Sequence, residues 1–370
     1  MSIGRYYGPL LLCVFLLQLS SCRGLRCTDE ENQEVDWYVN YKLPKLEAGH
    51  PKGSLVSEGK AYAYISSRQP GGWKLSPNGV TSQESMLAKT LKAVYDPKKN
   101  SSYLFYNDEP PAGYNGTSKG HLKGVVAFDG KSGFWLVHSI PKAFSPTGYA
   151  YPDNALSYGQ SVLCVTLTVH SLDEICNQLL HTRPFIYASR LTDPVASFLS
   201  DPAKTLFGRA PSFNRRPPYH RTTTLCTEQK KAFTSFVKDG RFNGDIYSAL
   251  LAPTLRTSLS AETWRRGSGT YLPPACEGPY DVTDVASVRM TLGNGDFIFK
   301  STDDHSKWAV TTHGDDGWIC VGDMNRMASQ GRRGGGSLCF QSTPVVKAYQ
   351  SLVYSSDQCP DLQSVTYRLQ

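Results

Sequence analysis

Residues 120–129, "GHLKGVVAFD", join a His-x-Lys step to an apolar run that is typical of a buried β-strand. A second His-x-Lys step occurs in residues 301–310, "STDDHSKWAV", and His305 follows His121 by 305 − 121 = 184 positions. A proline-rich stretch separates the two copies, and each copy lies at a similar depth within its own half of the chain. These matched positions indicate a diverged internal duplication, in which each half contributes one His-x-Lys strand.

The pattern of apolar residues predicts both strands and helices in each half. Besides the two His-x-Lys segments, strands are predicted at residues 35–45, 60–66, 102–108, 133–141, 161–169, 287–292, 296–301 and 317–322. Helices are predicted at residues 85–96, 171–181, 227–240 and 345–354. Such a mixture favours the α/β or α+β class.

The periodic pattern weakens between the halves, where prolines and basic residues accumulate. We therefore expect an N-terminal half at residues 25–200, a proline-rich basic connection at residues 201–225 and a C-terminal half at residues 226–370. Length alone does not distinguish a monomer from a homodimer.

The first residues are typical of a secretory signal peptide. Arg5 precedes the apolar run Pro9–Leu19, and small residues follow it, so we expect cleavage near Gly24 and a signal at residues 1–24. No later segment approaches the roughly 18 apolar residues of a membrane helix, so no stable membrane association is predicted. Asn100 and Asn115 begin glycosylation sequons, which suit an exported surface.

Ten cysteines are present, and eight remain after removal of the signal. An even number in an exported chain predicts disulfide bonds, although eight cysteines permit 105 pairings. The closely spaced cysteine pairs of a structural zinc site are lacking.

The formal charge is +7 at neutral pH, and loss of Arg5 and Arg23 with the signal leaves +7 − 2 = +5. This basic bias is compatible with a polyanionic partner. All eight histidines belong to the mature chain, so an acidic compartment would increase the positive charge.

The two His-x-Lys steps carry the chemistry. Residues i and i+2 of a strand share a face, so each strand would present an imidazole beside an ammonium group. Two such strands together could break a phosphodiester without a metal or cofactor. The lysines would neutralise phosphate oxygens, one histidine would attack phosphorus, and the other would protonate the leaving oxygen. Since one imidazole must be neutral and the other protonated, we expect an acidic optimum.

Paired His-x-Lys strands resemble the phospholipase D superfamily, and "GDMN" (322–325) resembles the Gly-x-x-Asn element of that motif. "VDWYVNYKLP", "GFWLVHSIP", "WICVGDMNRM" and "RRGGGSLC" are similar to the type II (acid, lysosomal) deoxyribonuclease family within that superfamily. The resemblance implies a phospholipase D-like fold with two pseudo-symmetric halves, each a central mixed β-sheet flanked by helices. It also implies an acid endonuclease that cuts DNA without divalent metal and leaves 3′-phosphate and 5′-hydroxyl ends, in lysosomes or after secretion.

The resemblance places four residues in the catalytic centre: His121, Lys123, His305 and Lys307. His121 is the expected nucleophile, which would form a phosphohistidine, and His305 the expected proton donor, although the pseudo-symmetry leaves these roles exchangeable.

The aspartate of the wider superfamily is missing, because Phe128 and Thr312 occupy its places. Candidates for support of the histidines are therefore Asp129, Asp323, His138 and Asn325. Candidates for contact with the DNA backbone are Arg332 and Arg333.

The resemblance further suggests the disulfides Cys27–Cys164, Cys276–Cys359 and Cys320–Cys339, which leaves Cys176 to meet Cys226. Two alternative functions share the same sequence features. One is another phospholipase D-like phosphodiesterase that acts on phospholipid, and the other is an inactive secreted relative that binds DNA or resembles a toxin.

Overall fold

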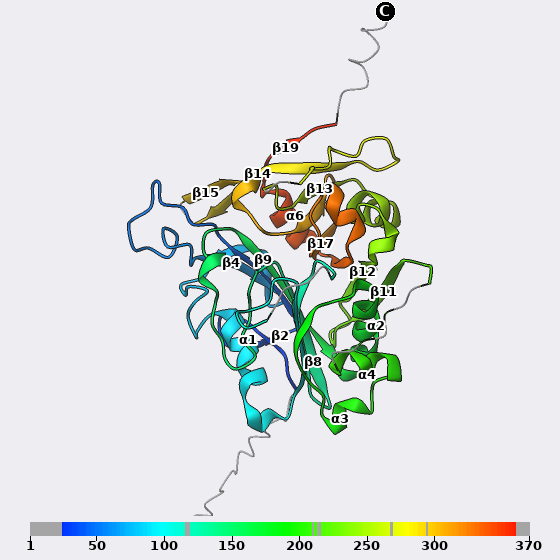
Figure 1. Ribbon diagram of the computed structural model, residues 1–370. Coiled ribbons are helices and arrows are strands. Elements are labelled where there is room, and N and C mark those ends of the chain that lie inside the picture. Colours follow the sequence, from blue (N-terminus) through cyan, green and yellow to red (C-terminus); the bar gives the residue numbers. More distant parts are fainter. Residues whose placement is uncertain are drawn as a thin grey trace, which may run out of the picture.

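The computed structural model describes residues 24–359 except 115–118, 209–210, 212, 214–215, 267–268 and 294. Two large β-sheets dominate the chain, with helices around them (Figure 1). This confirms the mixed α+β class. The signal peptide, apart from Gly24, and Asn115 lie outside the described residues.

The first sheet belongs to the N-terminal half. Its eight strands are, in spatial order, β10 (Ile186–Arg190), β6 (Ser102–Asn107), β7 (Lys123–Phe128), β8 (Ser132–His138), β9 (Gln160–Thr168), β3 (Trp37–Lys42), β4 (Tyr62–Ser66) and β5 (Gln69–Leu75). All neighbours are antiparallel, so the expectation of a mixed sheet in this half is wrong. Short connections such as residues 129–131 turn the chain straight back, which produces antiparallel pairs.

The second sheet belongs to the C-terminal half and is mixed, because β13 and β14 are parallel. Its main path runs β11 (His220–Cys226), β12 (Ala232–Lys238), β18 (Gly335–Gln341), β17 (Trp318–Gly322), β16 (Trp308–Thr311), β13 (Leu259–Glu262), β14 (Val282–Leu292) and β15 (Gly295–Lys300). β19 (Val353–Asp357) pairs with β14. A short hairpin of β1 (Cys27–Thr28) and β2 (Glu34–Val35) precedes both sheets.

Two predicted helices are confirmed as α1 (Met86–Tyr95) and α2 (Leu172–Thr182). The Ser85 side chain caps α1 by accepting a hydrogen bond from the Ala88 backbone N–H. The helix predicted at residues 227–240 is wrong, since β12 occupies it. β12 pairs with β11 and β18 along its length, and these ladders outweigh the helical spacing of its apolar residues.

The remaining helices are short. They are α3 (Asp193–Ala196), α4 (Asp201–Phe207), a π-helical turn at Tyr247–Leu251, α5 (Ala252–Leu255) and α6 (Thr343–Gln350). The connection between the halves is shorter than the expected residues 201–225, because α4 fills its beginning and β11 starts at His220. None of the helices in the described ranges is long and apolar enough to span a bilayer.

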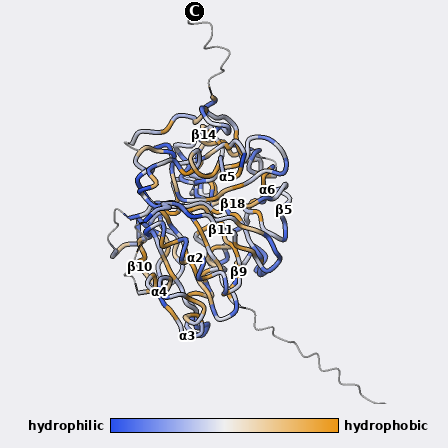
Figure 2. Tube along the Cα trace, turned by 90° about the vertical axis from the view of Figure 1, so that its right-hand side faces the viewer, coloured by the Kyte–Doolittle hydropathy of each residue, from blue (hydrophilic) through white to orange (hydrophobic). Residues whose placement is uncertain are grey.

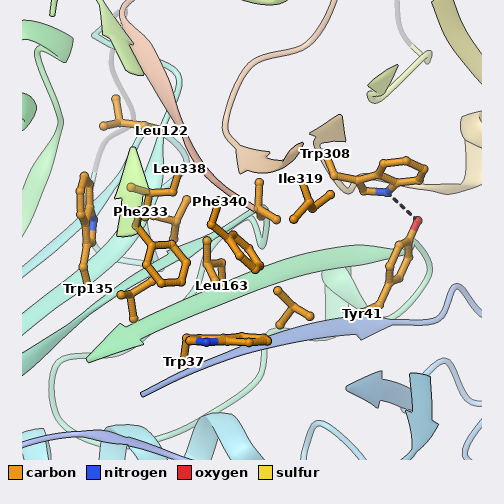
Figure 3. Packing of buried hydrophobic residues seen from close by; sticks show 14 of the residues in the cluster. Trp37, Tyr41, Leu122, Trp135, Leu163, Phe233, Trp308, Ile319, Leu338 and Phe340 are labelled. Atoms are coloured by element: carbon orange, nitrogen blue, oxygen red, sulfur yellow. Dashed lines mark hydrogen bonds between the residues drawn. The ribbon is translucent and has the colours of Figure 1, made fainter. Parts of the chain in front are cut away.

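The two sheets pack face to face and share one hydrophobic core (Figure 3). The Trp37 ring of the first sheet lies 5.3 Å from that of Phe340 in the second. Trp308 Nε1 donates to the Tyr41 hydroxyl across the same interface, at 3.3 Å. Apolar residues gather inside the molecule in Figure 2 as well. Burying a large apolar side chain contributes roughly 1.5–3 kcal/mol, so this shared core fixes the halves relative to each other.

Each half also lends a helix to the other. α2 follows β9 of the first sheet but packs against β11 and β12, where Gln178 Nε2 donates to the Ser235 carbonyl at 2.9 Å. α6 follows β18 of the second sheet but packs against β5, where Trp73 Nε1 donates to the Ala348 carbonyl at 3.1 Å. The two halves therefore pack against each other in a reciprocal way.

Three of the suggested disulfides are present: Cys27–Cys164, Cys276–Cys359 and Cys320–Cys339. The fourth pairing is wrong, because Cys176 and Cys226 are free thiols. Cys176 is buried in the core on α2, whereas Cys226 is exposed at the end of β11. Asn100 is also exposed, and its side-chain oxygen accepts from Arg190.

Candidate active site

The central strands of the two sheets have equivalent surroundings. β7 pairs with β8 and β8 with β9, while β16 pairs with β17 and β17 with β18. The two histidines are not within these strands. Each lies just before one of them, with His121 ahead of β7 and His305 ahead of β16. The short segments that lead into the strands therefore set the geometry of the site.

His121 is held by two hydrogen bonds from the second half. Its backbone N–H donates to the Gly334 carbonyl at 2.7 Å, and its ring Nδ1–H donates to the Asp323 carbonyl at 2.7 Å. Because Nδ1 carries the proton in this hydrogen bond, Nε2 of the neutral ring holds a lone pair. That tautomer suits a nucleophile.

His305 is held by two equivalent bonds from the first half. Its backbone N–H donates to the Gly159 carbonyl at 2.8 Å, and its ring Nδ1–H donates to the Ser139 carbonyl at 2.8 Å. The Gln160 side-chain oxygen lies 3.3 Å from the same ring nitrogen. The Trp264 ring contacts the imidazole edge to face, with centroids 5.0 Å apart.

These partners occupy matching places in the two sheets. Ser139 is the first residue after β8, as Asp323 is the first after β17. Gly159 immediately precedes β9, as Gly334 immediately precedes β18. Backbone carbonyls of the opposite half therefore orient each histidine. A backbone carbonyl thus has the orienting role that a carboxylate can have beside a histidine.

The two lysines differ in their partners. Lys123 Nζ forms an ion pair with Asp108 at 2.5 Å, and Arg333 binds the other oxygen of Asp108 at 2.9 Å. Lys307 Nζ instead donates to the His305 carbonyl at 2.5 Å, and its backbone N–H donates to Ser161 Oγ at 3.1 Å. Both lysine side chains are buried.

Burial governs the electrostatics of the site. Burial lowers the pKa of His121 to about 3, against the opposing effect of Asp108, and the nearby lysines lower it further. Burial also lowers the pKa of His305 well below its ordinary value, and the next contributions come from Lys307 and Lys123. The pKa of Lys307 falls to about 7, first because of burial and then because of Lys123. The four side chains therefore lie close enough to influence one another's charge.

The candidate supporting residues take different places. The carboxyl group of Asp323 is buried, which raises its pKa to about 8, and it accepts from the Lys123 backbone N–H at 3.3 Å. Asn325 acts indirectly, because its side-chain oxygen accepts from the backbone N–H of Trp264. His138 is buried at the end of β8, where its Nδ1 accepts from Ile140 and its Nε2 has no hydrogen-bond partner among the described residues. Burial lowers its pKa to about 3.

Asp129 does not support either histidine. It lies beyond the far end of β7 from Lys123, and six residues of strand span roughly 20 Å. Its carboxylate accepts backbone hydrogen bonds from Leu25, Lys131 and Ser132 and so stabilises the β7–β8 turn. That local role explains an acidic residue at this position.

The two arginines predicted to contact the DNA backbone, Arg332 and Arg333, have different surroundings. Arg333 is engaged with Asp108 and with the carbonyl oxygens of Lys119 and Gly120. Arg332 is exposed and faces an open cavity.

Two buried lysines that were not predicted from the sequence hold the loops of the site. Lys42, at the end of β3, donates to the carbonyls of Ala155, Leu156 and Tyr158, just ahead of Gly159. Lys238, at the end of β12, donates to three carbonyls of residues 330–333, just ahead of Gly334. Three acceptors match the three donors of an ammonium group. The signal was the repeated Lys-x-x-basic step after a strand, at 42–45 and 238–241.

Only one group of three potential metal ligands occurs among the described residues, namely Cys276, Asp281 and Cys359. The two cysteines are joined in a disulfide, so their thiolates are not available for a metal.

The chain is similar to known proteins over most of its length. The profile described as Deoxyribonuclease II matches residues 26–359. The chain is 36% identical to Deoxyribonuclease-2-alpha of Rattus norvegicus over 361 residues, which cover 95% of this chain and 99% of the relative. It is 34% identical to Deoxyribonuclease-2 of Caenorhabditis elegans over 382 residues, with 95% and 99% covered. It is 35% identical to Plancitoxin-1 of Acanthaster planci over 357 residues, with 93% and 95% covered.

Proposed function

Because the chain belongs to the deoxyribonuclease II family, we propose that it cuts DNA without divalent metal by means of two histidines with distinct roles. The observation that carries this proposal is the pair of rings held by opposite halves, each with Nδ1–H bound to a carbonyl. In both rings the Nε2 atom is therefore available to react with the substrate.

The first step forms a covalent intermediate. His121 Nε2 attacks phosphorus, the bond from phosphorus to the 5′-oxygen breaks, and His305 Nε2–H protonates that oxygen to give a 5′-hydroxyl. Lys123 and Lys307 neutralise the non-bridging phosphate oxygens, which removes the need for a metal cation.

The second step releases the product. His305, now neutral, takes a proton from water, and the oxygen of that water attacks phosphorus. The bond between phosphorus and His121 breaks, leaving a 3′-phosphate and the free imidazole. His121 suits the nucleophilic role because it stays neutral in acid, with its pKa lowered to about 3 by burial.

The same electrostatics support an acidic optimum. Burial and the nearby lysines lower the pKa of His305, so this ring becomes protonated in the free enzyme only at a more acidic pH than an ordinary histidine. A bound phosphodiester anion would raise this pKa, since it opposes the positive charge of the two lysines. Catalysis in an acidic compartment, either a lysosome or the surroundings of a secreted enzyme, follows from this proposal.

Plasmid cleavage at about pH 5 with a chelator present tests the function. We expect wild type to produce 3′-phosphate and 5′-hydroxyl ends. His121→Ala and His305→Ala should each lose roughly 10²–10⁴-fold in rate, while His313→Ala, at an exposed histidine, should match wild type. Absence of cleavage by wild type, or full activity of either catalytic variant, would refute the proposal.

A further inference from the structure

Three exposed arginines, Arg183, Arg241 and Arg332, line an open cavity of about 340 Å³. Its other lining residues are Asp239, Gly240 and Asn243. The carboxylate of Asp239 is already engaged by the Arg241 side chain at 2.7 Å, so this cavity has a net positive charge.

The cavity is built by two loops that are locked together. Gly240 packs directly on the Arg332 carbonyl, where a Cβ would clash with that oxygen. The Lys238 ammonium group holds the loop of residues 330–333, because it donates hydrogen bonds to three backbone carbonyls of that loop. Aromatic rings support two of the arginines, because Arg183 lies over Phe213 and Arg241 over Tyr219. The guanidinium groups are thus partly ordered in advance.

The cavity lies beside the first histidine. The Arg183 carbonyl accepts from the Gly120 N–H at 2.9 Å, and Gly120 is followed by His121. Gly334, which accepts from the His121 N–H, comes two residues after Arg332. Two residues of chain span at most about 7 Å. Both connections therefore place the backbones of Arg183 and Arg332 close to His121, within the length of a few nucleotides of a DNA strand.

The corresponding region beside the second histidine has a different charge balance. A larger cavity there includes Lys45, which follows Lys42 as Arg241 follows Lys238. Two of its three lysines are neutralised locally, since Lys45 pairs with Glu47 at 2.6 Å and Lys60 with Glu58 at 2.7 Å, which leaves Lys52 as a single excess positive charge in its lining. With histidine counted as neutral, the lining of the cavity beside His121 has a net charge of 3 − 1 = +2, against 3 − 2 = +1 for the cavity beside the second histidine.

We propose that Arg183, Arg241 and Arg332 form a subsite for a backbone phosphate that flanks the phosphodiester being cut. The ligand class is a DNA strand, recognised through its phosphate oxygens and without preference for base. This subsite rests on the proposed function, because it extends the substrate path away from His121.

The first experiment compares two substrates at pH 5 with a chelator. On oligonucleotides, Arg183→Ala and Arg332→Ala should each raise KM roughly tenfold with kcat within about twofold of wild type. On the 4-nitrophenyl ester of thymidine 3′-phosphate, which has no flanking phosphate, both variants should match wild type. Arg190→Ala is the matched control. Arg190 is also exposed, but it pairs with Tyr103, at the end of β6 that lies away from Lys123.

An unchanged KM on DNA would overturn the subsite, and so would an equal loss on the small ester, which would show that the arginines act through the catalytic centre.

A second experiment measures binding and does not depend on cleavage. In the His121→Ala background, Arg332→Ala should weaken binding of a labelled oligonucleotide about tenfold and reduce the salt slope by about 0.7–0.9. If wild type cuts neither substrate, the proposed function fails, while this binding result still decides the subsite.

Discussion

The two histidines are held by the same backbone framework but lie among different charged groups. Each ring donates to a carbonyl of the opposite half, and each backbone N–H donates to the glycine that immediately precedes β9 or β18. On the side of His121, an ion-pair cluster of Lys123, Asp108 and Arg333 surrounds the ring. On the side of His305, Lys307 has no carboxylate hydrogen-bonded to it among the described residues.

The buried acids show the same contrast. The nearby His121, Lys123 and Arg333 hold the pKa of Asp108 well below its usual range, against the effect of burial. Burial raises the pKa of Glu262 well above its usual range, and neither of its oxygens has a hydrogen-bond partner in the described part of the chain. The two halves thus share a backbone framework while their local charges differ. This difference supports our proposal that the two histidines take different roles.

The largest expected effect is on stability, from Asp108→Asn. Asp108 is charged and paired with two cations, and removing one member of a buried ion pair costs about 3–5 kcal/mol. Glu262→Gln is the matched control at the second half and should change stability by less than about 1 kcal/mol, since a protonated carboxyl group and an amide are both neutral. Urea unfolding at pH 5 measures both variants. Equal losses of stability in Asp108→Asn and Glu262→Gln would contradict the difference in charge between the two halves.

A smaller effect is expected where the halves are alike. Lys42→Met and Lys238→Met should each lower the free energy of unfolding by about 2–3 kcal/mol, because each leaves three backbone carbonyls without their donor. Thermal unfolding of the two variants provides the comparison. A loss confined to one lysine would mean that the loops are not held in equivalent ways.

The pH profile should show the asymmetry of the lysines. His305 must be protonated, so log kcat/KM should fall with slope −1 as the pH rises above the lowered pKa of His305. The pKa of Lys307 is about 7, so its charge is present below that pH and lost above it, which steepens the slope towards −2. Lys307→Arg should keep slope −1 throughout, because arginine remains charged.

Lys123→Arg serves as the control for this profile, since Lys123 already has a carboxylate partner. We expect it to retain the steeper limb of wild type. A profile that stays flat to pH 8, or one that Lys307→Arg leaves unchanged, would contradict this explanation of the acidic optimum.

Much of the fold could be predicted from local patterns. The helical spacing of residues 85–96 and 171–181 and the apolar runs at β7, β8 and β9 correspond to observed elements. β12 could not be recognised, because its identity as a strand depends on pairing with β11 and β18, whereas its own apolar residues have helical spacing. The antiparallel order of the first sheet likewise depends on which strands meet, and local periodicity does not encode this.

Of the candidate site, only the reactive side chains could be predicted from the sequence. His121, Lys123, His305 and Lys307 are visible as a repeated motif, and the structure brings them together. Their orienting partners are backbone carbonyls of Ser139 and Asp323, and a carbonyl leaves no mark in a sequence. The search for an aspartate therefore led to Asp129, which stabilises a turn.

We propose that the two histidines perform different steps. The 4-nitrophenyl ester of thymidine 3′-phosphate tests it most directly, because its leaving group departs without a proton. With chelator at pH 5, His305→Ala should release one equivalent of 4-nitrophenol in a burst and retain the nucleotide on His121 as an acid-labile phosphohistidine. His121→Ala should release none. Release by His121→Ala at the rate of wild type, or turnover by His305→Ala with no nucleotide bound to His121, would contradict the account.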